Sequence, residues 1–265
     1  MNTNEKEMIE VLKILKNDYG VYEIKAEFEA EGSRMEEMMR LKDVTTKLDL
    51  PIILKIGGVE AVTDIYASLS LGVKGVIAPM AETPFAVQKF LNTIKNFVPE
   101  DNAEDIEFAI NIETETTIEN LDAILSLPDL NLLSGVTIGR VDLLGSMGAD
   151  RSQVNSINIR DLCQSVFERC LNKGLNCGLG GAISTDSIEF IKHMSTNNLI
   201  EKYETRKVVY RASQESNFDY EKALLKGVEF ELLWLKSKQR YYSRIKHEDS
   251  TRIPMLEKRL AAAKK

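Results

Sequence analysis

The stretch 107–142, EFAINIETETTIENLDAILSLPDLNLLSGVTIGRVD, contains the pattern that decides the fold. It opens with an apolar run over Glu107–Glu113, continues with helical spacing over Thr116–Leu125, and reaches a second apolar run at Gly135–Gly139. Short runs rich in Val and Ile are typical of buried strands, and a helix between two of them indicates a parallel crossover. The stretch therefore predicts one strand–helix–strand unit of an α/β protein.

The same alternation continues on both sides of this unit. Further strands are expected at Val21–Glu29, Pro51–Ile56, Gly75–Pro79, Leu175–Gly178 and Lys207–Arg211. Helices are expected at Asn4–Lys16, Arg34–Leu48, Val59–Leu71, Pro84–Phe97, Ile159–Lys173 and Thr185–Met194. Seven strands in this order predict a TIM (β/α)8-type barrel with an atypical or missing first strand. A doubly wound open sheet is the alternative.

Composition limits the possible partners. A chain of 265 residues with 43% hydrophobic residues can bury one large core, so a single barrel domain over 1–265 is expected. The net charge of −7 argues against a nucleic-acid surface. The apolar runs are too short to cross a bilayer and no leader pattern opens the chain, so no membrane partner and a cytoplasmic location are expected. The three cysteines are expected to be buried thiols.

A long helix is expected near the C-terminus, over Phe218–His247, with residues 218–265 forming an extension of the barrel. Its apolar side chains follow one side, namely Leu224, Leu225, Val228, Leu232 and Leu235. The helix is longer than a barrel needs, and its surplus apolar surface predicts packing on a neighbouring subunit. Folding back on its own barrel is the alternative.

Two acids end consecutive predicted strands. Glu113 closes the first, and Asp142 follows the second. The carboxyl ends of parallel strands meet at one end of a barrel, so the two carboxylates should converge there. Mg²⁺ and Mn²⁺ bind a few carboxylates together with waters. Each acid alone could serve as a charge at a helix N-terminus, but the pair predicts a metal site.

The first expected strand carries charge on one face. Glu23, Lys25, Glu27 and Glu29 alternate with apolar residues there. A lysine inside a barrel can form a Schiff base if burial lowers its pKa, although an ion pair with Glu23 and Glu27 is the stronger expectation for Lys25. Glu27 is a candidate acid or base, with a solvated strand-end charge as its alternative.

The block from Ile112 to Gly148 resembles a known family. It contains IET at 112–114, IENLDAIL at 118–125, GVTIG at 135–139, DL at 142–143 and SMG at 146–148. These segments are similar to the signature region of the HpcH/HpaI aldolase and citrate lyase β-subunit superfamily. Similarity upstream brings the resemblance to roughly the first two-thirds of the chain, through IKAE at 24–27, PIILK at 51–55 and GVKGVIAPM at 72–80.

The resemblance implies a phosphoenolpyruvate/pyruvate-type barrel in which Glu113 and Asp142 hold Mg²⁺ or Mn²⁺. The cation would bind the carboxylate and keto oxygens of a small oxo acid while a carbon–carbon bond to an aldehyde or thioester is made or broken. Members of the family often form trimers or hexamers in which the last helix reaches a neighbour. A homo-oligomer is therefore expected through the C-terminal helix.

Several positions depart from the family pattern. Where the aldolase branch has a catalytic His, Phe28 follows Glu27, and the family's substrate-binding Arg is replaced by Lys55. Lys55 is expected to act catalytically and to bind the substrate carboxylate, although it lacks the fork of an Arg. Asn111 replaces a Gln as the orienting, substrate-binding amide, and Arg140 is a candidate substrate contact.

The main hypothesis is a metal-dependent carbon–carbon lyase or aldolase. The lost His and Arg motivate a second hypothesis, a non-catalytic or repurposed barrel, and the buried lysines motivate a Schiff-base aldolase. His193 and His247 lie on expected helices and are not expected to be catalytic. Arg206 is expected to pair with Glu204, with binding of an anionic substrate as its alternative.

Overall fold

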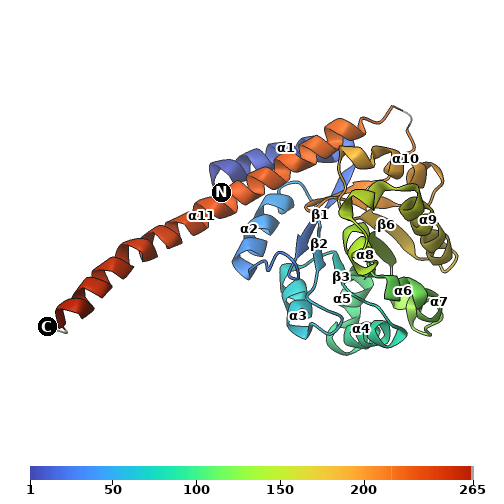
Figure 1. Cartoon of the computed structure of the whole chain (residues 1–265), viewed down its shortest axis with the longest axis horizontal. Helices are drawn as coiled ribbons and strands as arrows, with labels where there is room; N and C mark the ends of the chain where they lie inside the picture. Colours follow the sequence, from blue (N-terminus) through green and yellow to red (C-terminus); the bar gives the residue numbers. More distant parts are fainter. Residues whose placement is uncertain (216, 264–265) are drawn as a thin grey trace.

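The computed structural model describes residues 1–215 and 217–263. Its centre is a closed barrel whose eight strands follow one another in chain order (Figure 1). The strands are β1 (Val21–Glu27), β2 (Ile52–Lys55), β3 (Gly75–Ala78), β4 (Glu107–Ile112), β5 (Gly135–Gly139), β6 (Asn176–Gly180), β7 (Lys202–Glu204) and β8 (Val208–Arg211). This arrangement confirms the predicted TIM-type barrel and rules out an open sheet.

Helices surround the barrel. They are α1 (Thr3–Tyr19), α2 (Met35–Thr46), α3 (Val62–Leu71), α4 (Pro84–Phe97), α5 (Glu100–Asp105), α6 (Glu115–Glu119), α7 (Leu121–Ile124), α8 (Arg140–Ser146), α9 (Ile157–Leu171), α10 (Ile188–Thr196) and α11 (Tyr220–Ala263). Three short 3-10 turns lie between them, η1 (Leu130–Leu132), η2 (Arg151–Asn155) and η3 (Thr185–Ser187). The helix expected at Thr116–Leu125 is divided at Asn120, whose side chain donates to the carbonyls of Thr116 and Glu82.

The eighth strand corrects the sequence prediction. No first strand is missing; the unrecognised strand is β7, which pairs parallel to β6 and antiparallel to β8. Strand β8 also runs antiparallel to β1, so it closes the barrel from the opposite direction. Thr205 shapes the tight turn between β7 and β8, because its Oγ1 accepts the Val208 N–H at 3.2 Å. The start of β8 therefore lies at the same end of the barrel as the carboxyl ends of the other strands.

The two faces of the strands differ in chemistry. Outward side chains such as Ile24, Ala26 and Leu54 join the helices in one large apolar core. Inside the barrel, Glu23, Lys25 and Glu27 of β1 are all buried, as the alternation of charge in the sequence predicts for one face of a strand. The three cysteines are free and buried, which confirms that expectation.

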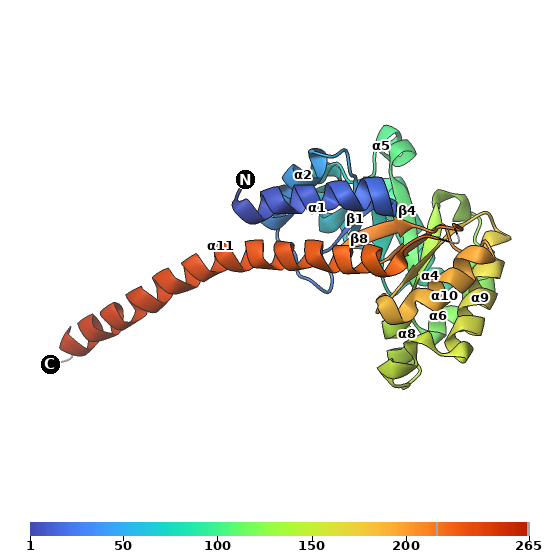
Figure 2. The same cartoon turned by 90° about the horizontal axis from the view of Figure 1, so that it is seen from above.

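The last helix, α11, is 44 residues long. Its first half lies beside α1 and buries Phe230 and Trp234, whereas its second half extends beyond the barrel (Figures 1 and 2). The first half therefore folds back on its own barrel, as the alternative for this helix predicted. An apolar stripe on the first half stays 48% to 58% exposed, namely Leu225, Val228, Leu232 and Leu235. None of the helices within the described residues is long and apolar enough to span a membrane.

Candidate active site

A cavity of about 470 Å³ lies at the carboxyl ends of the parallel strands. In barrels of this type the strand ends and the loops that follow them build the active site. The wall of this cavity also includes Val228 and Glu231 of α11. The charged lining residues are six carboxylates, Glu27, Glu29, Glu113, Asp142, Glu204 and Glu231, and four cations, Lys25, Lys55, Arg151 and Arg206. The surplus of carboxylates favours a bound cation.

Glu113 follows β4 directly and is almost fully buried. Its Oε1 accepts the Met80 N–H at 3.0 Å, and its Oε2 accepts the Asn111 side-chain amide at 2.9 Å. The Lys55 Nζ lies 3.3 Å from the same Oε2. Oε2 thus accepts from two donors, whereas Oε1 accepts from one and keeps a free lone pair. Glu113 can therefore bind a further group through Oε1 while these contacts hold its orientation.

Two backbone features accommodate the Glu113 side chain. Met80 has φ of 49°, a left-handed conformation that is uncommon for a side-chain-bearing residue, and its N–H points at Glu113 in this conformation. Gly139, at the end of β5, leaves room for the carboxylate. A Cβ at position 139 would lie only 2.8 Å from Glu113 Oε2. The local backbone is therefore built to position Glu113.

Asp142 lies in the first turn of α8 and is exposed, but it lines the same cavity as Glu113. Strand β5 ends at Gly139 and α8 begins at Arg140, so the chain turns directly from the barrel into the helix. The structure thus brings both predicted metal ligands to one cavity. Their side chains differ in environment, one held by protein donors and the other open to solvent.

Lys55, at the end of β2, lies between two acids. Its Nζ is 2.9 Å from Glu29 Oε2 and 3.3 Å from Glu113 Oε2. Burial alone would lower the pKa of Lys55, but the Glu113 and Glu29 carboxylates outweigh burial and raise it above its ordinary value. Lys55 is therefore a fixed positive charge next to the candidate metal site.

A second ion cluster joins β1 to β7. The Lys25 Nζ lies 2.5 Å from Glu204 Oε1 and 3.2 Å from Glu27 Oε1, with all three side chains buried. The predicted ion pair of Lys25 with Glu27 is present, so Glu27 is not a solvated charge. Burial would lower the pKa of Lys25, but both acids raise it. Burial would raise the pKa of Glu27, but Lys25 lowers it below its ordinary value.

Glu204 was not recognised as a site residue in the sequence. Instead, Arg206 was expected to pair with it, and this expectation is wrong. The Arg206 Nε donates to Glu31 Oε1 at 3.0 Å, and the buried Lys207 Nζ also contacts Glu31. Glu31 therefore ties the loop after β1 to the turn between β7 and β8, and Glu204 remains with Lys25.

Arg140 does not line the cavity. It is fully buried, and its guanidinium donates to the carbonyls of Gly180, Gly181 and Val154 and to the side chain of Asn155, over 2.8 to 3.1 Å. The Arg140 guanidinium also lies over the ring of Phe190. Arg140 therefore anchors the loop after β6 in place of the expected contact with substrate.

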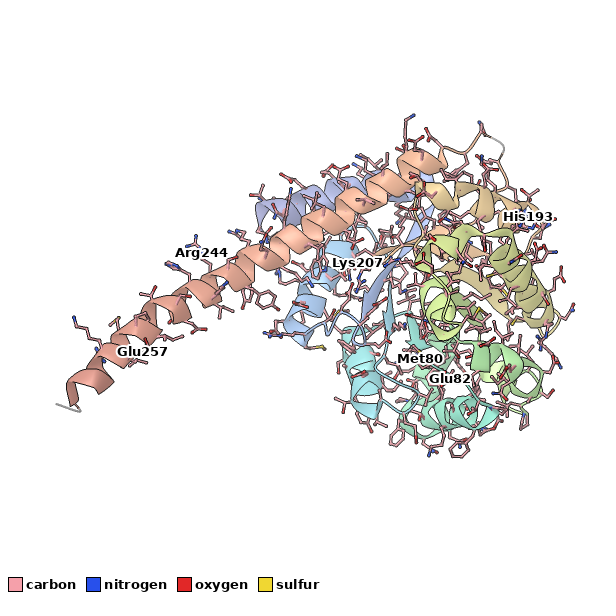
Figure 3. All side chains as sticks on the ribbon, in the orientation of Figure 1. Met80, Glu82, His193, Lys207, Arg244 and Glu257 are labelled. Carbon is pink, nitrogen blue, oxygen red and sulfur yellow. The ribbon has the colours of Figure 1, made fainter. Side chains whose placement is uncertain are left out.

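Phe28 and the two histidines lie outside the cavity lining. Phe28 packs against the main apolar core, so it does not fill the pocket. His193 contacts Gln164 on the outer side of the barrel, at a distance from Met80 in Figure 3. His247 belongs to the exposed extension of α11. As expected, neither histidine is placed to act as a base in this cavity.

The donor set fits a hard divalent cation with few protein ligands. Within 1–215 and 217–263, no group of three His, Cys, Asp or Glu side chains is placed to hold a metal. Glu113 and Asp142 could supply two carboxylates, as Mg²⁺ accepts when waters and substrate oxygens complete its octahedron. Asn111 Oδ1 is buried beside Glu113 without a hydrogen-bond partner in the described structure, and it could accept from a metal-bound water.

Solved structures show where else this fold occurs. The HpcH/HpaI aldolase from Desulfitobacterium hafniense DCB-2 is 14% identical, with a TM-score of 0.59 over 74% of this chain and 80% of that one. Citrate synthase SbnG is 16% identical, with a TM-score of 0.59 over 75% and 81%. Macrophomate synthase is 16% identical, with a TM-score of 0.53 over 88% and 90%. At this identity the similarity shows the fold alone.

No curated protein sequence matches the chain. A family model does match, and it covers residues 33–177, more than half of the sequence. The matched range contains Lys55, Asn111, Glu113 and Asp142. The chain belongs to the HpcH/HpaI aldolase/citrate lyase family.

Proposed function

We propose that the protein is a divalent-metal-dependent carbon–carbon lyase or aldolase that acts on a small oxo acid. The observation that carries the proposal is the presence of Glu113 and Asp142 on one cavity at the strand ends, in a chain of the aldolase/citrate lyase family. The protein contacts on Glu113 support it, because ligands of a catalytic metal are held by neighbouring donors.

A bound Mg²⁺ or Mn²⁺ would supply Lewis-acid stabilisation of the negative charge that develops on the keto oxygen of the substrate. Glu113 and Asp142 would hold the cation. Asn111 and the Met80 N–H would keep Glu113 in its orientation. The ammonium of Lys55 would attract the carboxylate of the oxo acid, as a point charge without the two parallel hydrogen bonds of an Arg.

Glu27 is the proposed proton acceptor in the cleavage direction. Its lowered pKa keeps it ionised at neutral pH, and it lines the cavity. Glu27 would take the proton of the substrate hydroxyl, whose oxygen then forms the carbonyl of the leaving aldehyde. The electron pair of the broken carbon–carbon bond stays on the carbon next to the keto group, which takes up a proton from water.

The rival hypotheses receive less support. A Schiff base needs a neutral amine, and the raised pKa values of Lys25 and Lys55 keep both lysines protonated. A non-catalytic barrel was motivated by Phe28, but this ring packs in the core and leaves the cavity open. The absence of the family's His and Arg remains its motivation.

The test needs no knowledge of the aldehyde. We expect the protein to exchange the methyl protons of pyruvate with D₂O in the presence of Mg²⁺, because this exchange passes through the same carbanion next to the keto group as the cleavage reaction. Proton NMR can measure the exchange rate. Asp142→Asn should lower the exchange rate and the Mn²⁺ affinity by more than about 100-fold, since one of two carboxylate ligands is lost.

Asp186→Asn is the matched control. Asp186 is also an exposed acid in the first turn of a helical segment, but it does not line the cavity. It should leave exchange and Mn²⁺ affinity unchanged. Mn²⁺ binding without exchange would favour the repurposed barrel, and equal effects of the two substitutions would reduce Asp142 to a helix N-terminal charge.

We also propose a homo-oligomer that uses the apolar stripe of α11. Its four exposed aliphatic side chains support this proposal, because a monomer rarely leaves such a stripe uncovered. Light scattering after gel filtration should give a mass above that of one chain, 29.9 kDa, and Leu232→Glu with Leu235→Glu should lower it. A monomeric unmodified protein would contradict this proposal.

A further inference from the structure

Glu204 has an oxygen that the protein leaves unused. Its side chain is 3% exposed and lines the cavity from β7. Lys25 contacts Oε1 at 2.5 Å, whereas no donor within the described residues reaches the buried Oε2. A carboxylate oxygen that is buried without a donor is costly, so its persistence in a cavity wall indicates a function.

Charge balance does not explain Glu204. Lys25 already has a second carboxylate, Glu27, at 3.2 Å, so two acids surround one ammonium. Gly180 on the neighbouring strand leaves room for the Glu204 side chain, because a Cβ at position 180 would lie 3.3 Å from Glu204 Oε1. The β6 and β7 backbones thus leave space for a surplus carboxylate that faces the cavity.

Glu204 lies on the side of the cavity that would face the part of a substrate farthest from the metal. The candidate metal ligands come from β4 and α8, while Glu204 comes from β7 on a different side of the barrel. An oxo acid bound at Glu113 and Asp142 would extend its remaining carbons across the cavity toward the wall of Glu204, Thr205 and Glu231. On this wall the ammonium of Lys25 is bound by carboxylates and the hydroxyl of Thr205 by the Val208 backbone.

We propose that Glu204 determines which carbonyl partner the enzyme accepts, by receiving a hydrogen bond on Oε2 from a donor group on the aldehyde half of the substrate. The inference rests on the proposed lyase function and adds a substrate class to it, an aldehyde that carries a hydroxyl or an ammonium group. A simple alkyl aldehyde leaves the carboxylate oxygen buried and unpaired. Sites built around a substrate donor reject analogues that lack it.

The experiment compares acceptors of equal length in condensation with pyruvate and Mg²⁺. Glyceraldehyde carries hydroxyl donors, 3-aminopropanal carries an ammonium, and propanal carries neither. For the unmodified protein, we expect kcat/KM to be about 10- to 100-fold higher with a donor-bearing acceptor than with propanal, in line with a hydrogen bond to a charged group. The two donor-bearing acceptors show which source of the donor is used.

Two substitutions at Glu204 test the assignment. Glu204→Ala should reduce the preference to about twofold or less, mainly through a higher KM for the donor-bearing acceptor, and leave the Mn²⁺ affinity unchanged. Glu204→Gln keeps the size of the side chain and guards against misfolding, and it should reduce the preference in part. Glu201→Gln makes the same charge change just before β7, outside this cavity, and should keep the full preference.

The outcomes distinguish a failure of the Glu204 assignment from a failure of the lyase function. Equal kcat/KM values for all three acceptors in the unmodified protein, or a preference that survives Glu204→Ala, would overturn the role of Glu204 while pyruvate exchange still supports the lyase. Absence of both exchange and condensation would overturn the lyase and this inference with it.

Discussion

Two walls of the same cavity handle charge in different ways. On the wall of β4 and α8, Glu113 is held by neutral donors and one lysine, and Asp142 has no ion-pair partner within the described residues. On the wall of β1 and β7, Lys25 lies between two buried acids. The first wall leaves carboxylates open to a cation, whereas on the second wall two buried acids share one ammonium. Removal of a carboxylate from the first wall should therefore weaken cation binding, whereas removal of Lys25 from the second wall should destabilise the fold.

The largest effect on stability is expected from Lys25→Met, which removes the buried cation of the second wall. It leaves Glu204 and Glu27 buried without their cation, and breaking a buried ion pair in this way costs about 3–5 kcal/mol. Urea denaturation should show this loss in the free energy of unfolding. Lys192→Met, at an exposed pair with Glu189, should cost less than about 1 kcal/mol. Similar values for the two variants would remove the distinction between the walls.

A smaller effect is expected on the first wall from Gly139→Ala. The added methyl group would lie 2.8 Å from Glu113 Oε2 and 3.1 Å from Glu113 Cβ, so the carboxylate must move. Mn²⁺ affinity should fall by about 10-fold, as is usual when the support of a metal ligand is disturbed. Gly145→Ala in α8 meets no neighbouring atom and serves as the control. Unchanged affinity in Gly139→Ala would separate Glu113 from metal binding.

The pH dependence of stability tests Glu27 on the second wall. Because the pKa of Glu27 is lowered in the folded protein, its contribution to stability is present above the ordinary pKa of a Glu side chain and is lost as the pH falls through the lower pKa of the folded state. Glu27→Gln should lower the free energy of unfolding by on the order of 1 kcal/mol at pH 7. The difference in the free energy of unfolding between the two proteins, measured by urea denaturation, should shrink as the pH is lowered toward 3. A constant difference would contradict the assignment.

The smallest effect is expected from Arg206→Ala. The Arg206 side chain is 52% exposed, and Lys207 also contacts Glu31, so the loss should be within about 0–1 kcal/mol. Thermal unfolding can measure it against Lys207→Met, which removes the buried partner and should be more destabilising. The opposite ranking would show that the exposed contact holds the loop.

Much of the first wall could be predicted from the sequence, because its residues follow local rules. The acids after two consecutive strands predicted that Glu113 and Asp142 would share a cavity. On the second wall, the alternation in β1 predicted only the buried charged face of that strand. Asn111 precedes Glu113 on the same strand face, so its contact with Glu113 also follows from a spacing of two residues.

The second wall depends on contacts that no local pattern contains. Lys25 and Glu204 are 179 residues apart, and their pairing requires the closure of the barrel by β7 and β8. Strand β7 has three residues, too few to show an alternation. The burial of Arg140 likewise depends on the loop after β6 folding over it.

The place of β8 as the last strand in the chain also determines when the barrel can form during synthesis. Strand β1 emerges from the ribosome early, but its second neighbour is the last strand of the sheet, and β7 shares that neighbour. Until residues 208–211 have emerged, β1 and β7 each present an unpaired edge that can join other chains. Completion of the fold should therefore come late in synthesis, and the nascent chain is most prone to aggregation before this short hairpin closes.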